Sequence, residues 1–480
     1  MSIKTILLLF LIFFSSVTLA QSFITRDIKS FGAKGNGKSN DQAAFKKAEA
    51  YFNARGGYGK LIISTGTYIV GNQKFTGGQY RKPAYDGEDI LHFNNIKNLS
   101  IEGAIGATIK YKNGLRIGSF SPKTGAAFDH GNNFFRDFSF AANPGTCIYL
   151  QNCNNVKIYN LSLDGNNQNM ILGGVYGDVG MQLPHYGVFI WNSRNIEVNK
   201  VYAHHFGLDG ISIGNKESSL PDSINIINCT FEYNARQGFS WIGGNGIYVK
   251  SSQFNHTGKC KFSSPPGAGI DIEAEVGPIK NGVFDSCDFI DNTGVGLLAL
   301  AGDSKECKFT NCNFWGSTNR AIWLNKPAYS FNNCKIYGSV LEGYNSDNEN
   351  DATKFYNCLF EDTIYNNKRT YGNYLVESRN VKRMSFTNCT FISKVKKLVS
   401  LSCPDSLSIP QRYHLINCDF FVKNENLPAS DFIAVTKGVV AINCKFNFVG
   451  DEALQKKYNF NFTSATNPGS SGTKILYKGK

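Results

Sequence analysis

Two carboxylates separated by a single residue are the side chains in this sequence with the clearest capacity for chemistry. Asp271 and Glu273 lie in Gly269-Ile-Asp-Ile-Glu273, an alternating segment opened by a glycine. If the segment is a strand, both side chains point to one face, about 6–7 Å apart at Cα. Carboxylates this close can have their pKa values pushed apart, so that one serves as acid and the other as base or nucleophile. Glycoside hydrolysis requires such a pair, and the spacing does not decide between retention and inversion.

Four other segments have the same form, and they place further side chains beside this pair. They begin at Gly187, Gly210, Gly238 and Gly296. Strands in successive coils of a repeat protein stack about 4.8 Å apart. If the first residue after each glycine points inward, the second residue after the glycine points outward. The outward residues of the five segments then form one row: Phe189, Ser212, Ser240, Asp271 and Leu298.

The stacking predicts a compact group that we call the carboxylate patch: Asp209, Arg236, Asp271 and Glu273. Asp271 and Glu273 are the predicted catalytic residues, with Asp209, two coils away, as the alternative second carboxylate. Neighbouring coils have no charged residue at these positions, so the patch is local. The side chains predicted to contact a substrate lie in and around it: Arg236, Gln237, His185, His204, His205, Tyr186 and Trp191.

The same residues also permit a different reaction. In β-elimination on a uronic acid, a cation neutralises the carboxylate of the sugar while a base removes a ring proton. Asp271, Glu273 and Glu275 offer oxygen ligands of the kind that Ca²⁺ prefers. The base would then be one of three nearby side chains, Arg236, His256 or Lys259. Ca²⁺ is the cofactor expected for this lyase alternative, and the hydrolase needs no cofactor or metal.

A purely structural interpretation stands beside both reactions. The acidic pair could face solvent or form an ion pair with Arg236, and His204-His205, which lie at a coil corner, could simply be hydrogen-bonded there.

A repeating cysteine position indicates the architecture that would hold these side chains. Eight cysteines each follow Asn or Ser and stand two residues before Phe or Ile: Cys229, Cys287, Cys312, Cys334, Cys358, Cys389, Cys418 and Cys444. The chain has 13 cysteines, an odd number, and no Cys-x-x-Cys pair. A ladder of small buried thiols therefore fits better than disulfides or a metal site. Leu161, Val201 and Ser252 occupy equivalent positions, and steps of roughly 22 to 40 residues are typical of a solenoid.

The residue before most of these cysteines is Asn. Stacked Asn side chains hydrogen-bond to the coils above and below, so the sequence predicts a structural amide ladder at Asn228, Asn311, Asn333, Asn357, Asn388, Asn417 and Asn443.

The N-terminal region carries a family resemblance. It resembles the opening of the pectate-lyase-3 and polygalacturonase-like proteins in three successive features. These are the segment Phe31-Gly-Ala-Lys-Gly-Asn-Gly-Lys-Ser-Asn-Asp41, a helix expected over 41–54, and Gly66-Thr-Tyr68. These proteins are right-handed parallel β-helices. The resemblance implies that the helix caps the N-terminal end of the solenoid and shields an open sheet edge.

Further along the chain, the motifs that would fix a reaction are incomplete. Leu208-Asp209-Gly210-Ile211 is similar to the Asn-Thr-Asp-Gly segment of polygalacturonases. The chain lacks their Asp-Asp pair, their Gly-His-Gly and their Arg-x-Lys in the expected order, and it lacks the Trp-x-Asp-His pattern of pectate lyases. The resemblance thus implies the fold and leaves the reaction open.

The predicted fold is an all-β, right-handed, single-stranded parallel β-helix with an N-terminal capping α-helix. Residues 1–20 read as a signal peptide cleaved after Ala20, with Ile6 to Phe14 as its apolar core. The β-helix domain is expected over 21–450, with 26–70 as the cap and first coil, and 451–480 as a capping or frayed tail. The mature protein is therefore expected to be secreted or periplasmic.

The net charge of the chain indicates the kind of molecule that it binds. The formal net charge is +13, which suits an anionic polysaccharide as substrate. The sequence has no basic run interleaved with aromatic residues, so it does not predict nucleic-acid binding. It also has no apolar run long enough to predict membrane insertion. We expect a monomer. The predicted function is a secreted carbohydrate-active enzyme, a glycoside hydrolase with paired carboxylates; the alternatives are a Ca²⁺-dependent polysaccharide lyase and a non-catalytic glycan-binding or surface solenoid.

Overall fold

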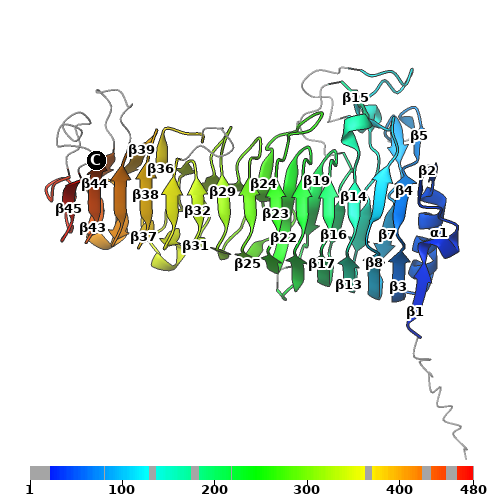
Figure 1. The fold of residues 1–480 in the computed structure, drawn as a ribbon, viewed down its shortest axis with the longest axis horizontal. Coiled ribbons are helices and arrows are strands. Elements are labelled where there is room, and N and C mark those ends of the chain that lie inside the picture. The colour runs from blue at the N-terminus through cyan, green and yellow to red at the C-terminus, as the bar shows by residue number, and fades with distance from the viewer. Residues whose placement is uncertain are drawn as a thin grey trace, which may run out of the picture.

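Each coil of the chain contains three short strands, and each strand pairs in parallel with the equivalent strand of the next coil. The computed structural model describes residues 22–79, 82–128, 137–174, 183–217, 219–362, 370–423, 434–449 and 462–478. Within these residues the stacked coils form a long solenoid (Figure 1). The parallel β-helix expected from the sequence is confirmed, whereas the predicted signal peptide lies outside the described residues.

Three parallel sheets form the walls of the solenoid, and we call them sheets I, II and III. Sheet I contains β7 (Leu91–Asn94), β12 (Ile148–Gln151), β16 (Val188–Trp191), β19 (Asp209–Gly214), the first part of β22 (Gln237–Lys250), β24 (Ala268–Ile272), β27 (Leu297–Ala299), β30 (Ile322–Leu324), β33 (Val340–Leu341), β36 (Tyr374–Arg379), β39 (Lys397–Ser402) and β42 (Val435–Lys437).

Sheet II contains β1 (Ile24–Asp27), β3 (Gly57–Ile63), β8 (Lys97–Gly103), β13 (Asn154–Tyr159), β17 (Arg194–Asn199), β20 (Ile224–Ile227), the second part of β22, β25 (Ile279–Asp285), β28 (Cys307–Thr310), β31 (Ser330–Asn332), β34 (Lys354–Tyr356), β37 (Ser385–Thr387), β40 (His414–Ile416) and β43 (Val440–Ile442). Because β22 runs from sheet I into sheet II without a break, the two sheets join at that coil.

Sheet III contains β2 (Asn36–Asn40), β4 (Gly66–Val70), β9 (Ala107–Tyr111), β14 (Ser162–Asp164), β18 (Tyr202–His204), β21 (Thr230–Glu232), β23 (Gln253–Asn255), β26 (Asp288–Ile290), β29 (Asn313–Trp315), β32 (Lys335–Tyr337), β35 (Leu359–Glu361), β38 (Thr390–Ser393), β41 (Asp419–Val422), β44 (Lys445–Val449) and β45 (Lys474–Lys478).

Alternation within each strand sets which side chains enter the core. In β3, every second residue is buried, as the two-residue period of a strand requires. Equivalent phenylalanines of neighbouring coils then stack along the interior: the ring centroids of Phe391 and Phe420 lie 4.5 Å apart, and those of Phe420 and Phe446 also 4.5 Å. The core is thus a set of side-chain columns parallel to the long axis.

The corner between sheets II and III explains the repeated Asn. In every coil from Asn160 to Asn443, one residue forms this corner and has a left-handed backbone conformation, with φ between 48° and 55°. Asn tolerates this conformation better than most residues. The predicted amide ladder is also present in the last coils, where the side-chain amide of Asn388 donates to Asn357 (3.3 Å) and that of Asn417 to Asn388 (3.1 Å).

The cysteine ladder is confirmed. All 13 cysteines are free thiols, and all but Cys260 are buried. The Cys229 Sγ donates to the carbonyl of Val198 in the preceding coil (3.4 Å), and burial raises the pKa of this thiol to about 12.

We therefore expect a thiol-specific reagent such as Ellman's reagent to modify at most one cysteine, Cys260, in the native protein. Denaturant should expose all 13, because the ladder thiols lie inside the solenoid, where the reagent does not reach them. Reaction of several thiols while the far-ultraviolet circular dichroism stays native would contradict the buried ladder.

The N-terminal cap matches its prediction closely. Helix α1 (Gln42–Ala54) buries Ala44, Phe45, Ala48 and Phe52 and packs against β3 and β7 at the end of the solenoid (Figure 1). Its N-cap is Asp41, whose carboxylate accepts from the backbone of Lys34 and Gly35 (2.7 and 3.0 Å). The helices in the described part of the chain are too short or too polar to cross a membrane.

Two parts of the chain lie outside the regular run of coils. The irregular region 71–145 contributes to a small separate sheet of β5 (Gln73–Phe75), β6 (Tyr85–Gly87), β10 (Arg116–Ser119), β11 (Ala141–Ala142) and β15 (Ile171–Gly173), which stands out from the N-terminal half of the solenoid (Figure 1). Within the tail expected over 451–480, β45 pairs in parallel with β44 and extends sheet III.

Candidate functional site

The outward row predicted on the glycine-opened strands is present on sheet I. The register pairs Phe189 with Ser212, Ser212 with Ser240, Ser240 with Asp271 and Asp271 with Leu298. Asp209 and Gln237 are also register partners, three residues before this row. The sequence therefore predicted which residues of five coils stand side by side.

The carboxylate patch contains a buried ion pair. The Arg236 guanidinium donates to Asp209 through Nε (2.8 Å to Oδ1) and Nη2 (2.5 Å to Oδ2). Asp209 is 0% and Arg236 4% exposed. Burial alone would lower the pKa of Arg236, but the Asp209 carboxylate raises it, so the guanidinium stays charged.

This pairing corrects the role predicted for Asp209. A carboxylate with no exposed surface and two hydrogen bonds from a guanidinium does not reach a substrate. Asp209 is placed to fix and neutralise Arg236, and the alternative in which it serves as the second catalytic carboxylate loses support.

Asp271 is a buried carboxyl group of the patch. It is 3% exposed, and its Oδ2 accepts a hydrogen bond from the Gln237 side-chain amide (2.6 Å). Burial raises the pKa of Asp271 well above its usual range; the charge of Glu273 raises it further, whereas Arg236 opposes the shift. Asp271 is therefore biased toward the protonated acid.

Glu273 lies next to Asp271 at the surface. Its side chain is half-buried and that of Glu275 is exposed, so both reach solvent freely, whereas Asp271 keeps only its 3% exposed surface. Within the described residues, the oxygens of Asp271, Glu273 and Glu275 are not gathered closely enough to form a ready-made metal site. The structure thus pairs one buried carboxyl group with one accessible carboxylate.

Aromatic side chains extend the outer face of sheet I toward the N-terminus. The ring of Tyr186 stacks on that of Phe189 (centroids 4.8 Å apart, planes at 13°), and Trp191 lies tilted 5.8 Å from Phe189. The row continues through Tyr149, stacked on Phe189 at 4.9 Å, and His92, stacked on Tyr149 at 4.2 Å.

Sequence reasoning missed Tyr149 and His92, although each is the outward residue between two apolar ones, as in Leu91-His-Phe93 and Ile148-Tyr-Leu150. The long insertion between their coils hid the register. Flat, half-buried rings of this kind suit contact with sugar faces.

His185 does not lie in the patch, which corrects its predicted role. It is 0% exposed, and it packs edge-on against Tyr111 at 4.7 Å and near Phe206 at 5.2 Å. Its Nδ1 accepts from the Gly207 backbone N–H (2.8 Å). Burial lowers the pKa of His185 to about 3, so it is a neutral core residue.

Replacing His185 with Asn should weaken the dependence of stability on pH. The unfolded chain takes up a proton at His185 below about pH 6.5, whereas the native chain does so only near its folded pKa of about 3. In that window this residue lowers the unfolding free energy by up to about 1.4 kcal/mol per pH unit as the pH falls. The amide can still accept from Gly207 but cannot titrate. The difference in melting temperature between wild type and H185N should shrink between pH 6.5 and pH 3; a constant difference would contradict the assignment.

His204 and His205 are also separate from the patch. They lie at the end of β18 on sheet III, where Asp164, Glu232 and Lys110 are the charged groups that act on them. Two of the three side chains offered as lyase bases share this face: His256 Nδ1 lies 3.2 Å from Glu232, and Lys259 forms an ion pair with Asp291. Glu232 is the last residue of β21 in sheet III, and Asp291 directly follows β26 of the same sheet.

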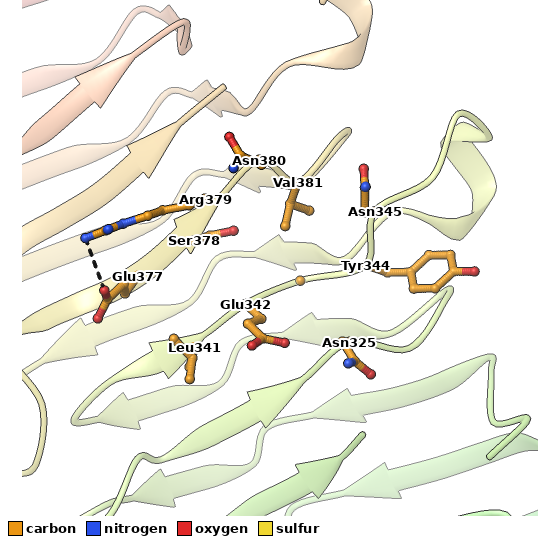
Figure 2. Close-up of a pocket in the computed structure, with 11 residues that line it drawn as sticks. Asn325, Leu341, Glu342, Tyr344, Asn345, Glu377, Ser378, Arg379, Asn380 and Val381 are labelled. Atoms are coloured by element: carbon orange, nitrogen blue, oxygen red, sulfur yellow. Dashed lines mark ion pairs between the residues drawn. The ribbon is translucent and has the colours of Figure 1, made fainter. Parts of the chain in front are cut away.

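A cavity of about 530 Å³ opens further along the solenoid. It is lined by residues including Glu342, Tyr344, Glu377 and Arg379 (Figure 2). Glu377 is on the outward row of sheet I, paired in register with Leu341, and its carboxylate forms an ion pair with Arg379 (3.5 Å). The cavity has no buried carboxyl group like Asp271, so the patch remains the candidate reactive centre and the cavity a surface on the same face.

Comparison with known proteins gives both a family and individual relatives. The family model described as right handed beta helix region matches residues 36–274, 179–328 and 222–420. A probable polygalacturonase of Arabidopsis thaliana is 25% identical over 292 residues, which are 52% of this chain and 62% of that protein. The match therefore spans less than two thirds of that relative.

Solved structures give weaker similarities. The A-module of a mannuronan C-5 epimerase from Azotobacter vinelandii is 17% identical with a TM-score of 0.46, covering 83% of this chain and 96% of that one. A family 28 exopolygalacturonase from Yersinia enterocolitica is 12% identical with a TM-score of 0.41, covering 87% and 78%.

Proposed function

The chain belongs to the right-handed β-helix family, and from that premise we propose that it is a carbohydrate-active enzyme that cleaves a polysaccharide on the outer face of sheet I. The observation that carries the proposal is the adjacency of Asp271, buried and biased toward its protonated form, and Glu273, half-buried on the same face. A pair of carboxyl groups in unlike environments is what acid–base cleavage of a glycosidic bond requires.

In this proposal the two groups have different roles. Asp271 donates its proton to the leaving oxygen of the glycosidic bond. Glu273 activates a water molecule or attacks the sugar directly. Gln237, which donates to Asp271 Oδ2, orients the acid. The buried Arg236–Asp209 pair supports the floor of the site, and Arg236 is a positioning residue because little of it is exposed.

The surroundings of the pair support a long, anionic substrate. Stacked rings from His92 to Trp191 lie along the same face on one side of Asp271. On the other side the register continues through Leu298, Trp323 and Leu341 to Glu377. A glycan lying along the solenoid axis would contact both. The net charge of +13 and the polygalacturonase named among the relatives favour an acidic sugar. We also place the mature chain outside the cytoplasm, on the signal-like residues 1–20.

The test is to incubate the purified protein with acidic and neutral glycans, polygalacturonate among them. Reducing ends and ultraviolet absorbance are followed together. Hydrolysis predicts new reducing ends without absorbance. Reducing ends with absorbance would mean an unsaturated product, hence the Ca²⁺-dependent lyase, and loss of that activity in EDTA would establish it. Binding without any cleavage across the panel would replace the enzyme with a glycan-binding solenoid.

A further inference from the structure

The outer face of sheet III carries a second group of titratable side chains, away from the carboxylate patch. Asp164 in β14 and His204 in β18 are register partners in neighbouring coils, and His205 follows at the corner. The ligand atoms of these three side chains all lie within 4.8 Å of one another. Among the described residues, no other set of three or more His, Cys, Asp or Glu side chains is so closely gathered.

The two imidazoles converge because of the backbone at the corner. Consecutive residues of a strand point to opposite faces, so His204 and His205 would normally diverge. His205 instead has a left-handed conformation with φ of 56°, as do the corner residues Tyr233 and His256 in the following coils. The turn brings the His205 ring back to the side of His204, and the two Nδ1 atoms approach to 2.7 Å.

Neighbouring rings hold both imidazoles in place. His204 stacks on Tyr202 with centroids 4.3 Å apart, and His205 stacks on Tyr233 at 5.3 Å with planes at 13°. The Tyr202 hydroxyl is itself fixed by donating to Glu232 (2.7 Å). Side chains held in this way do not have to be ordered when a ligand binds, which favours binding.

The third side chain is oriented as metal ligands commonly are. Asp164 Oδ2 accepts from Lys110 Nζ (2.6 Å), and Oδ1 accepts from the Asn166 backbone N–H (2.8 Å). Oδ1 faces His204, with its oxygen 3.9 Å from Nδ1. Outer-shell hydrogen bonds of this kind fix the direction of a coordinating carboxylate. The Lys110 charge is balanced by Asp164, and Glu232 adds a further negative charge near the histidines.

We propose that Asp164, His204 and His205 form a binding site for one divalent transition-metal ion, with Zn²⁺ as the best fit. Zinc binds imidazole nitrogen and carboxylate oxygen at about 2.0–2.2 Å, which sets neighbouring ligand atoms roughly 3.3–3.5 Å apart in a tetrahedron. The separations of 2.7 and 3.9 Å bracket this value, and the third is within 4.8 Å, so shifts of about 1 Å close the site.

Ligand chemistry and coordination number agree with this choice. Imidazole and carboxylate suit Zn²⁺ and the neighbouring transition metals, whereas Ca²⁺ and Mg²⁺ take oxygen ligands. Three protein ligands leave a fourth position open for water or for an oxygen of a ligand. The site is independent of the reaction proposed on sheet I, because its residues lie on another sheet.

The experiment uses the full-length protein prepared without a histidine tag and stripped of metal by chelation. Zn²⁺ is titrated in competition with a chromophoric chelator, and Co²⁺ is added separately to record the visible absorption typical of tetrahedral coordination. We expect one ion per chain and a rise in melting temperature with Zn²⁺, since an ion that binds only the native state stabilises it.

Three variants test the ligands while keeping the local structure. His204→Phe keeps the stack on Tyr202, His205→Asn suits the left-handed corner, and Asp164→Asn keeps the shape of the side chain. Each should weaken Zn²⁺ binding by more than the ~10–100-fold that loss of an outer-shell partner costs, and should abolish the rise in melting temperature. His414→Ala, at a half-buried histidine of sheet II, should bind like wild type.

Two outcomes would overturn the proposal. One is the absence of stoichiometric binding of Zn²⁺ or Co²⁺ by the wild-type protein. The other is binding that survives in all three variants while their melting temperatures without metal match that of the wild type. In either case the contact between the two Nδ1 atoms would be an ordinary hydrogen bond at a corner.

Discussion

Asp271→Asn is expected to lower kcat on the glycan identified by the panel by about 10²–10⁴-fold, the usual contribution of a general acid. The amide keeps the size of the side chain and can still contact Gln237, but it has no proton of suitable acidity for the leaving oxygen. Turnover is measured under saturating substrate, together with the melting temperature. A substantial loss of kcat with unchanged melting temperature assigns the effect to chemistry rather than folding.

The pH profile gives this prediction a second readout. Because burial raises the pKa of Asp271, the acid stays protonated above the usual carboxyl range, and activity should fall as the pH rises through that raised pKa. This falling limb should disappear from the residual activity of D271N. The matched control is Asp303→Asn, which removes an exposed carboxylate just after β27 and should leave kcat unchanged. Equal kcat in D271N and wild type would move the reactive centre elsewhere.

The fold was largely predictable because one short pattern recurs. Each coil repeats an apolar alternation, a corner residue and a small buried residue, and the positions from Leu161 to Cys444 all come directly before a strand of sheet III. The N-terminal family resemblance is confirmed by the family match. The region 71–145 was not predictable in the same way, since β7, β8 and β9 join the solenoid while β5, β6, β10 and β11 leave it for a separate small sheet.

The candidate site was predictable only within a strand. Glycine-opened strands share one register, so the row from Phe189 to Leu298 could be aligned from the sequence. The alternation of side chains with a period of two holds only within a strand, however, and does not predict where a side chain points beyond a corner. The left-handed backbone of His205 turns its side chain to the same face of sheet III as His204. Two adjacent histidines in a sequence do not predict this conformation.

The ion pair shows a related limit. Aligning the glycine-opened strands in the sequence predicted that Asp209 and Arg236 lie close together. It could not predict which carboxylate forms the ion pair with the guanidinium. The choice depends on depth: Asp209 is fully buried beside Arg236, whereas Glu273 reaches solvent. A buried guanidinium needs the partner that is buried with it, because an unpaired buried charge is costly.

Removing Arg236 should therefore be the most destabilising single change in the site. We expect Arg236→Met to lower the unfolding free energy by about 3–5 kcal/mol, since it leaves the Asp209 carboxylate buried without its partner. Denaturant unfolding followed by circular dichroism measures the effect. The matched control is Lys60→Met, which breaks the Lys60–Glu102 pair (2.7 Å, side chains 34% and 39% exposed) and should cost about 1 kcal/mol or less.

The double variant Asp209→Leu/Arg236→Met separates stability from function. Replacing both members of a buried pair with apolar residues of similar size often restores stability, so the double variant should be more stable than R236M alone. Its turnover should stay low, because Gln237, the register partner of residue 209, loses the ion pair that supports it and with it the position from which it orients Asp271. Recovery of both stability and turnover would show that the pair serves the fold alone. If R236M costs no more than K60M, the ion pair does not hold the site together.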